Sequence, residues 1–229
     1  GSCPGADPEY PLPAMYATRL FPFLVAVALL GAGCQSMYYA TMEKFGVEKR
    51  DLLKKAVVSA RDSQEAAATE FKDALTRLRE MYAVNAGDLE KNYDKLKGEY
   101  ESADKSAATV RKRIKDMDQV AGDLFTEWEK EITQFSNPTY ASNSRRQLNE
   151  TRTKYQQLSA SVKSAEASME PVLKQLKEQV LYLKHNLNAA AIGSLRGEAS
   201  SIQAEITRLI DQMNGSIHQA DEFIKTLPQ

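Results

Sequence analysis

Long apolar segments are scarce in this 229-residue chain. One apolar stretch, residues 20–30, has about 11 residues, whereas a helix that crosses a bilayer needs roughly 20. The formal net charge is only −1, so the chain has no overall electrostatic attraction to nucleic acid or to anionic lipid. The sequence therefore predicts neither a membrane-spanning helix nor a nucleic-acid-binding protein.

Cysteine is equally rare, because the chain contains only Cys3 and Cys34. We expect Cys3 to lie in a segment that is removed and Cys34 to be modified by lipid, for reasons given below. The mature chain is therefore expected to contain no disulfide, although an oxidising compartment would permit one.

Sequence motifs of known chemistry are also missing. The chain has no glycine-rich phosphate loop, no cysteine cluster, no HExxH motif and no nucleophile elbow. His185 and His218 lie on different predicted helices and lack the further donors that a zinc site needs. The basic run 111–115 is followed at once by Asp116 and Asp118, as on a solvated helix face. We expect no catalytic, cofactor-binding or metal-binding residues, no nucleic-acid partner and no enzymatic activity.

The N-terminal part has the organisation of an export signal. Residues 1–14 contain four prolines and no periodicity, and we interpret them as a remnant of cloning or of upstream translation. From Met15 onward, a single charge at Arg19 precedes the apolar stretch 20–30, and small residues lead to Cys34. A short charged region, an apolar region and small residues before a cleavage point define a signal peptide. Residues 15–33 are therefore predicted to be a lipoprotein signal peptide.

The sequence from Leu30 to Cys34 (Leu-Gly-Ala-Gly-Cys) resembles the lipobox of bacterial lipoproteins, although Gly31 stands where leucine is most usual. The resemblance implies that the Cys34 thiol carries a diacylglycerol and that its amine is acylated after cleavage. Gln35 then implies transfer to the outer membrane. Three acyl chains, at about 0.8 kcal/mol per buried methylene, would anchor the protein durably. The alternative is an ordinary secretory signal in which Cys34 is incidental.

Residues 34–46 are predicted to form the lipidated cysteine and a tether, and residues 47–229 a helical bundle. The tether is unusually apolar and aromatic, with Tyr38 and Tyr39 placed where they could reach the lipid headgroups. Alternatively, it packs on the bundle.

The remainder of the chain is dominated by apolar residues that recur every 3.5 positions, which is the signature of coiled-coil-like helices. We predict helices over residues 47–82, 88–135, 144–190 and 195–227. The fold class is therefore all-α: an elongated antiparallel bundle of four long coiled-coil-like helices, built on a long helical hairpin. The apolar seam of that hairpin consists of Leu89, Tyr93, Leu96, Tyr100, Ala103, Ala107, Val110, Ile114, Met117, Ala121, Leu124, Trp128 and Phe135 on the first helix, and Leu148, Thr151, Tyr155, Leu158, Val162, Ala165, Met169, Val172, Leu176, Gln179 and Leu183 on the second.

Turn chemistry predicts the breaks between these helices. Ser136–Pro138 should stop the second helix, and a capping box from Ser144 to Gln147 should start the third. Pro171 should kink the third helix without breaking it, because the seam keeps its phase there. Residues 192–194 should form the last turn.

Four aromatic residues gather near the predicted hairpin tip: Phe125, Trp128, Phe135 and Tyr140. Trp128 and Phe135 lie on the seam, so packing in the core is expected for them. Phe125 and Tyr140 lie off the seam, which leaves contact with a partner or a membrane as the alternative to core packing. All four are therefore candidate residues of a contact surface.

Four segments mark a resemblance to a known family: residues 43–53 (EKFGVEKRDLL), 127–129 (EWE), 169–173 (MEPVL) and 180–188 (VLYLKHNLN). With them, residues 37–227 resemble an uncharacterised proteobacterial lipoprotein family that is known only as a domain of unknown function. The resemblance implies a bacterial envelope source and assigns no functional residue.

We therefore predict a lipid-anchored, periplasm-facing scaffold or interaction protein at the outer membrane, with an unidentified protein partner. The alternative is a membrane-binding or membrane-shaping helical module. A monomer is favoured, although wide apolar faces could also close between two chains. Alternating helices should place Phe135 nearer to Gly46 and Leu227 than to Gly87 or Ser194. The hairpin should then project by about 20 Å, unless residues 37–46 extend the first helix alongside it.

Overall fold

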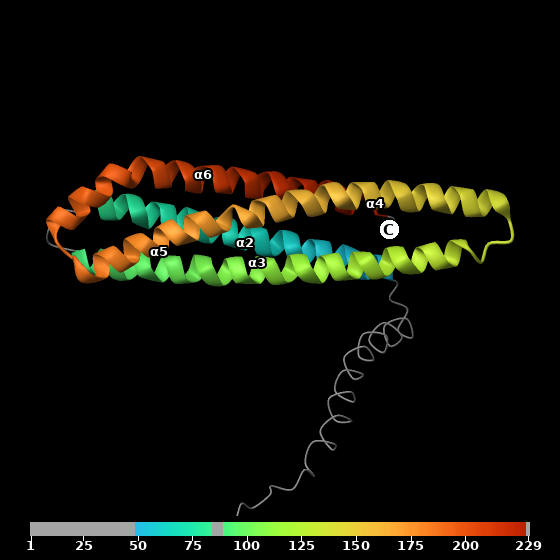
Figure 1. Cartoon of the computed structure of the whole chain (residues 1–229), viewed down its shortest axis with the longest axis horizontal. Coiled ribbons are helices and arrows are strands. Elements are labelled where there is room, and N and C mark those ends of the chain that lie inside the picture. Colours follow the sequence, from blue (N-terminus) through green and yellow to red (C-terminus); the bar gives the residue numbers. More distant parts are fainter. Residues whose placement is uncertain (1–48, 84–88, 228–229) are drawn as a thin grey trace, which may run out of the picture. The chain divides into compact units, whose positions relative to one another are not determined.

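The computed structural model describes residues 49–83 and 89–227 (Figure 1). Within these ranges the ordered elements are all helices: α2 (Lys49–Ala83), α3 (Leu89–Ile132), α4 (Pro138–Ala167), α5 (Met169–His185) and α6 (Ala189–Thr226). Residues from Lys49 onward form one compact unit. The all-α prediction is confirmed.

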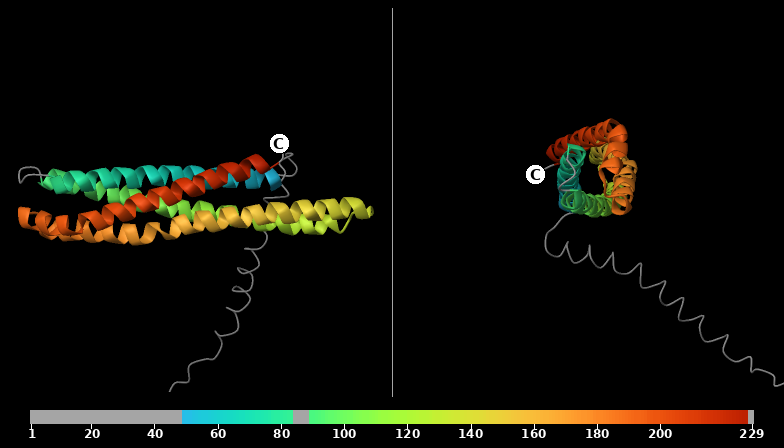
Figure 2. Two further views of the ribbon diagram at one scale, coloured as in Figure 1. Left: turned by 90° about the horizontal axis from the view of Figure 1, so that it is seen from above. Right: turned by 90° about the vertical axis from the view of Figure 1, so that its left-hand side faces the viewer.

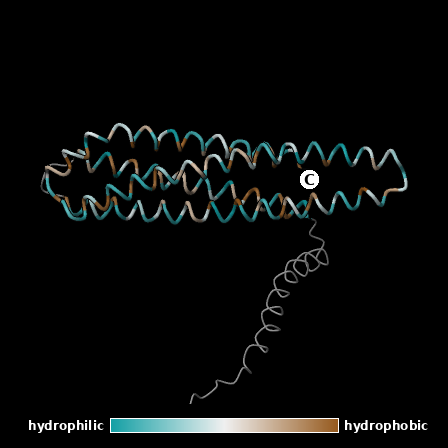
Figure 3. Tube along the Cα trace, viewed as in Figure 1, coloured by the Kyte–Doolittle hydropathy of each residue, from teal (hydrophilic) through white to brown (hydrophobic). Residues whose placement is uncertain are grey.

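The helices form because their apolar residues fall on one face. On α2 a stripe of residues spaced three and four apart is buried: Leu53, Val57, Ala60, Gln64, Ala67, Phe71, Ala74, Leu78 and Met81. On α4 and α5 the predicted seam is buried as well, except for Thr151, which is half-buried. Figure 3 shows the same alternation as apolar and polar residues that follow each other along every helix. Each helix buries one stripe of residues and exposes the other to solvent. Because α4 and α5 follow each other as one rod, the described helices make four rods, which pack around a shared core.

The rods alternate in direction around that core. Helix α2 packs against α3 and α6, and the rod made by α4 and α5 packs against the other sides of α3 and α6. In the end-on view of Figure 2, α2 lies on the opposite side of the bundle from α4 and α5, with α3 and α6 between them. This is an up-and-down four-helix arrangement, as predicted.

Pro171 has the kinking effect that its position predicts. The helix is interrupted at one residue, Ser168, whose backbone keeps right-handed helical angles (φ −73°, ψ −13°). Its N–H still donates to the carbonyl of Ser164 at 3.2 Å. Because proline has no N–H, the carbonyl of Ala167, four residues before Pro171, loses its helical donor. Helices α4 and α5 therefore follow each other as one bent rod (Figure 1).

The predicted turn before α4 is wrong in its position. Helix α4 begins at Pro138, and the Asn137 side chain caps it by accepting from the N–H groups of Thr139 (2.9 Å) and Tyr140 (3.4 Å). Proline is favoured in the first turn of a helix, where its missing N–H costs nothing. Pro138 therefore starts the next helix, and Ser144, the expected cap, lies inside it.

The last turn also lies earlier than predicted. Helix α5 ends at His185, and Asn188 caps α6 by accepting from the N–H of Ala191 at 3.0 Å. Gly193, whose neighbourhood favoured a turn, is an ordinary helical residue of α6. The connection between the first two predicted helices, residues 83–87, and the predicted helix start at residue 88 fall largely outside the described residues, which omit 84–88.

A buried amide ties three helices together. Gln64 on α2 is fully buried, and its Nε2 donates to the backbone carbonyl of Val162 on α4 at 3.2 Å. Its Oε1 lies 2.7 Å from the hydroxyl of Ser216 on α6, which also lies 2.9 Å from the carbonyl of Met213. A buried polar group without partners is costly, so this network favours one axial position of each helix.

Loss of the Ser216 hydroxyl should therefore destabilise the bundle. We expect Ser216→Ala to lower the free energy of unfolding by about 1–2 kcal/mol, because Gln64 Oε1 loses its donor inside the core. Urea unfolding followed by circular dichroism measures the change.

Ser200→Ala is the matched control, because Ser200 is an exposed residue of the same helix. Its effect should stay within about 0.5 kcal/mol. Equal effects of the two substitutions would contradict a structural role for the Gln64 network.

Candidate contact surface at the hairpin tip

Helices α3 and α4 extend past the start of α2 and the end of α6. Lys49, the first residue of α2, pairs with Glu127 on α3. Near the end of α6, the ring of Phe223 lies 5.9 Å from the ring of Tyr155 on α4. At 1.5 Å per residue, α4 runs on for about 25 Å from Tyr155 back to Pro138. We call residues 128–148 the hairpin tip.

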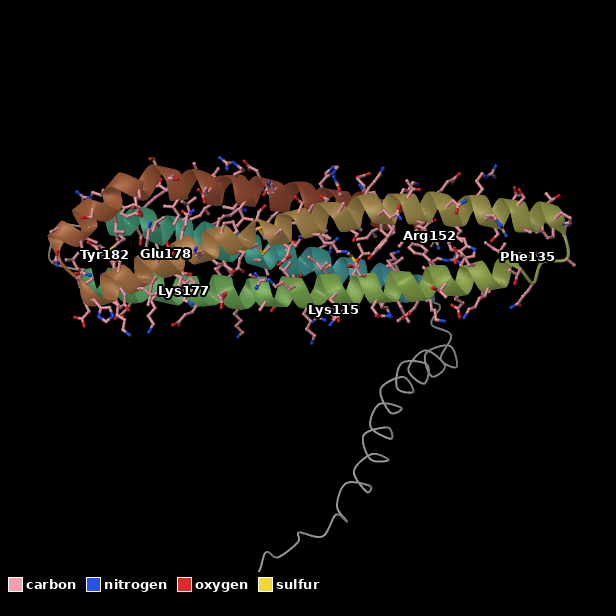
Figure 4. All side chains as sticks on the ribbon, in the orientation of Figure 1. Lys115, Phe135, Arg152, Lys177, Glu178 and Tyr182 are labelled. Atoms are coloured by element: carbon pink, nitrogen blue, oxygen red, sulfur yellow. The ribbon has the colours of Figure 1, made fainter. Side chains whose placement is uncertain are left out.

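The tip lies at the end of the bundle where α2 begins and α6 ends. Figure 4 places Phe135 at the opposite end from Tyr182, which lies near the end of α5. The C-terminal end of α6 contacts Tyr155, whereas Ser194 borders the same groove as Tyr182. The expectation that Phe135 is nearer to Leu227 than to Ser194 is therefore confirmed, while Gly46 and Gly87 lie outside the described residues.

Phe125 belongs to the core and not to a contact surface. Only 7% of its area is exposed, and its ring meets Tyr155 edge-on at 5.7 Å between centroids. The guanidinium of Arg152 covers it at 5.2 Å. The prediction that Phe125 lies off the seam is wrong, because a helix with 3.6 residues per turn drifts by about 20° per heptad against a strict 3.5-residue repeat. By this point in α3 the buried stripe has moved from Leu124 to Phe125.

Trp128 has an internal role as well. The residue is half-buried, and its indole N–H donates to the Ser144 hydroxyl at 2.8 Å. This bond joins α3 to α4 within the tip. Close by, the Arg152 side chain pairs with Glu129 at 2.9 Å across the same two helices.

Phe135 and Tyr140 are the exposed aromatic residues of the tip. Their exposed fractions are 46% and 62%. The prediction that Phe135 packs in the seam is wrong, because α3 ends at Ile132 and the chain tightens there: the Gln134 N–H donates to the Glu131 carbonyl, only three residues back, at 2.9 Å. Phe135 thus leaves the helical phase, and Ile132, which is 3% exposed, closes the core in its place.

The carboxylate of Asp118 on α3 connects this helix to α4 next to the hairpin tip. Asp118 accepts from the Tyr155 hydroxyl at 2.7 Å and from Ser159 at 3.0 Å, and it pairs with Lys163 at 2.7 Å. Burial pushes the pKa of Asp118 upward, but the bonds from Lys163, Tyr155 and Ser159 outweigh it and leave that pKa below its ordinary value. Burial, aided by the Asp118 charge, raises the pKa of Tyr155, which therefore keeps its proton and its hydrogen bond. These bonds therefore hold α3 and α4 together where the hairpin begins to project.

Other sequence features have structural roles in the described part of the chain. Arg111, from the basic run, pairs with Glu166 and Glu170 across to α4 and α5. His185 and His218 are exposed, and within residues 49–83 and 89–227 no group of three or more histidine, cysteine or acidic side chains is placed to hold a metal ion. None of the helices described combines the length and apolarity needed to cross a bilayer. Cys34 lies outside the described residues.

The fold defines a class, an all-α up-and-down bundle with one projecting hairpin. Residues 38–227 match the family described as "Protein of unknown function (DUF2959)", and the chain belongs to this family. No curated protein matches the chain in sequence.

Two phenylalanines ten residues apart, one in the core and one in the hairpin tip, test this assignment of core and surface. We expect Phe125→Ala to lower the free energy of unfolding by about 3–5 kcal/mol, because it empties a packed site between Tyr155 and Arg152. Phe135→Ala should change it by less than about 0.5 kcal/mol, because the ring is exposed. Urea unfolding of both variants provides the comparison. A large loss with Phe135→Ala and a small one with Phe125→Ala would reverse the assignment of core and surface.

Proposed function

We propose that this chain is a lipid-anchored interaction protein of the bacterial envelope, held at the periplasmic face of the outer membrane through Cys34. In this proposal the bundle is a scaffold, and the exposed aromatic residues of the hairpin tip contact a protein partner. The single observation that carries the contact role is the projection of the tip, with Phe135 and Tyr140 exposed at its end.

Aromatic side chains suit such a role because they offer a large contact area at a small cost in conformational entropy, and interface hot spots are enriched in them. A projecting hairpin also separates the contact from the rest of the bundle. Because Trp128 and Asp118 join α3 to α4, the tip presents its two aromatic rings on a preorganised support.

The anchor is proposed from the sequence. The segment from Leu30 to Cys34 supports lipidation, and Gln35 supports delivery to the outer membrane. Residues 34–46 then supply the tether.

A membrane-binding role is the second candidate, and the position of the tip favours it. Fifteen residue steps separate Cys34 from Lys49, so the start of α2 can lie at most about 50 Å from a membrane-inserted Cys34. The tip projects from that same end of the bundle. Phe135 and Tyr140 would then enter the headgroup layer, where amphipathic aromatic rings are favoured.

A photo-crosslinking residue at the tip distinguishes these roles. We expect p-benzoylphenylalanine in place of Tyr140 to give, in intact bacterial cells, one discrete protein adduct. Electrophoresis and mass spectrometry identify the adduct. The same residue in place of Lys115, which is exposed on the body of α3, should give none.

Adducts to phospholipid at position 140 would favour the membrane-binding role. Equal adducts at both positions, or none at position 140, would contradict a contact function of the tip.

Cys34→Ala in the same cells tests the anchor, because it should abolish acyl labelling and remove the chain from the membrane fraction. Unchanged lipid labelling of that variant would disprove lipidation at Cys34.

A further inference from the structure

A second candidate site lies at the end of the bundle opposite the tip. A groove of about 660 Å³ separates α5 from α6, and its walls include Glu178, Gln179 and Tyr182 on α5 and Leu195 and Glu198 on α6. Figure 4 shows Glu178 and Tyr182 at this end, far from Phe135. The volume is within the range of about 300–1,000 Å³ that is usual for small-molecule sites.

The floor of the groove carries a buried amide with unused hydrogen-bonding capacity. Gln179 is only 5% exposed, and its Oε1 accepts from the hydroxyl of Tyr82 on α2 at 2.8 Å. Burial, more than any other effect, raises the pKa of Tyr82 to about 12, so the hydroxyl keeps its proton. In this bond the amide oxygen of Gln179 points toward α2.

The nitrogen of that amide is left facing the groove. It donates to no acceptor among the described residues, and in this part of the chain no side-chain nitrogen or oxygen that is sealed from solvent lacks a partner. The Gln179 Nε2 must therefore be open to solvent, and the groove is the opening that this side chain lines. It presents an N–H donor that is preorganised for an acceptor on a ligand.

The walls of the groove also carry hydrogen-bond acceptors, in contrast to the Gln179 N–H donor. Glu178 and Glu198 are exposed carboxylates, and neither makes an ion pair within 4.0 Å in the described structure. Glu198 lies close enough to Tyr82 for its charge to contribute to the raised pKa of that phenol. Tyr182 leaves 41% of its surface exposed beside them, and Leu195 adds an apolar floor.

This combination selects the chemistry of the ligand. An anion would meet two carboxylates, and a simple cation would leave the Gln179 N–H without an acceptor. A hydroxyl group donates to a carboxylate and also accepts from an amide, so a polyhydroxylated ligand satisfies both kinds of group. The exposed ring of Tyr182 offers a flat apolar surface for the C–H face of a sugar ring. We propose that the α5–α6 groove binds a carbohydrate of one or two sugar rings.

Titration with soluble disaccharides tests this site. The chain from Gln35 onward, which contains the complete bundle, is labelled with ¹⁵N and titrated with N,N′-diacetylchitobiose, cellobiose and maltose. We expect saturable shifts of the Gln179 side-chain amide with at least one of them. Tyr182→Ala and Glu198→Gln should each weaken the binding about tenfold, since each removes a contact made by an exposed side chain.

The controls separate this site from general effects and from the tip. Glu150→Gln removes the same charge from the far end of the bundle and should leave the affinity unchanged, as should Phe135→Ala. Sedimentation with insoluble chitin, as a polymeric source of the sugar, distinguishes a glycan strand from a free sugar. Because this site does not depend on the tip, its failure and the failure of the proposed function are separate results.

Three results would overturn the proposal. These are no saturable binding of any disaccharide up to about 10 mM together with no sedimentation, equal weakening by Glu150→Gln, or shifts of the Gln179 amide with spermidine or inorganic phosphate in place of sugar.

Discussion

The amide of Gln64 is the constraint on which the arrangement of the bundle depends. Apolar seams alone allow helices to slide, because one layer of alanine and leucine resembles the next. Gln64 is fully buried and bonds to Val162 on α4 and Ser216 on α6. A slip of α2 by one helical turn, about 5.4 Å, would separate the Gln64 Oε1 from the Ser216 hydroxyl and leave this buried oxygen without that donor. We infer that this network selects the observed register.

Once the register is set, the unequal lengths of the helices determine the two ends. Helix α3 has 44 residues and α2 has 35, so α3 and α4 must project where α2 starts. In the projecting part, α3 and α4 have only each other as helical neighbours. Its stability therefore depends on local bonds such as the one from Trp128 to Ser144. At the other end, the Tyr82–Gln179 bond spans the bundle diagonal and orients the amide beneath the α5–α6 groove. Both candidate sites are thus consequences of how the rods are aligned.

The 3.5-residue repeat predicted the four rods and most of their buried residues, because burial of one stripe is what forms these helices. It was wrong at Phe125, where the helix has drifted out of phase with the 3.5-residue repeat, and at Phe135, which lies beyond the end of α3. The turns were misplaced because Pro138 and Gly193 stand in helices, and their signals as breakers also fit helix starts and interiors. Gln179 was visible as a polar residue in the seam, which is the one sign of the groove in the sequence. The groove itself could not be predicted, because the repeat does not specify which flanks of α5 and α6 face each other.

The most direct test of this account measures distances between the rods. The chain from Gln35 onward contains no native cysteine, so spin labels can be placed at Arg145, Lys184 and Lys225 through cysteine substitutions. From the contact between Phe223 and Tyr155 and the rise per residue, the 145–225 pair should lie about 20 Å apart and the 184–225 pair about 45–50 Å apart. Double electron–electron resonance resolves this difference. A longer distance for the 145–225 pair than for the 184–225 pair would show that the tip does not lie at the end where α6 finishes, and would contradict the account.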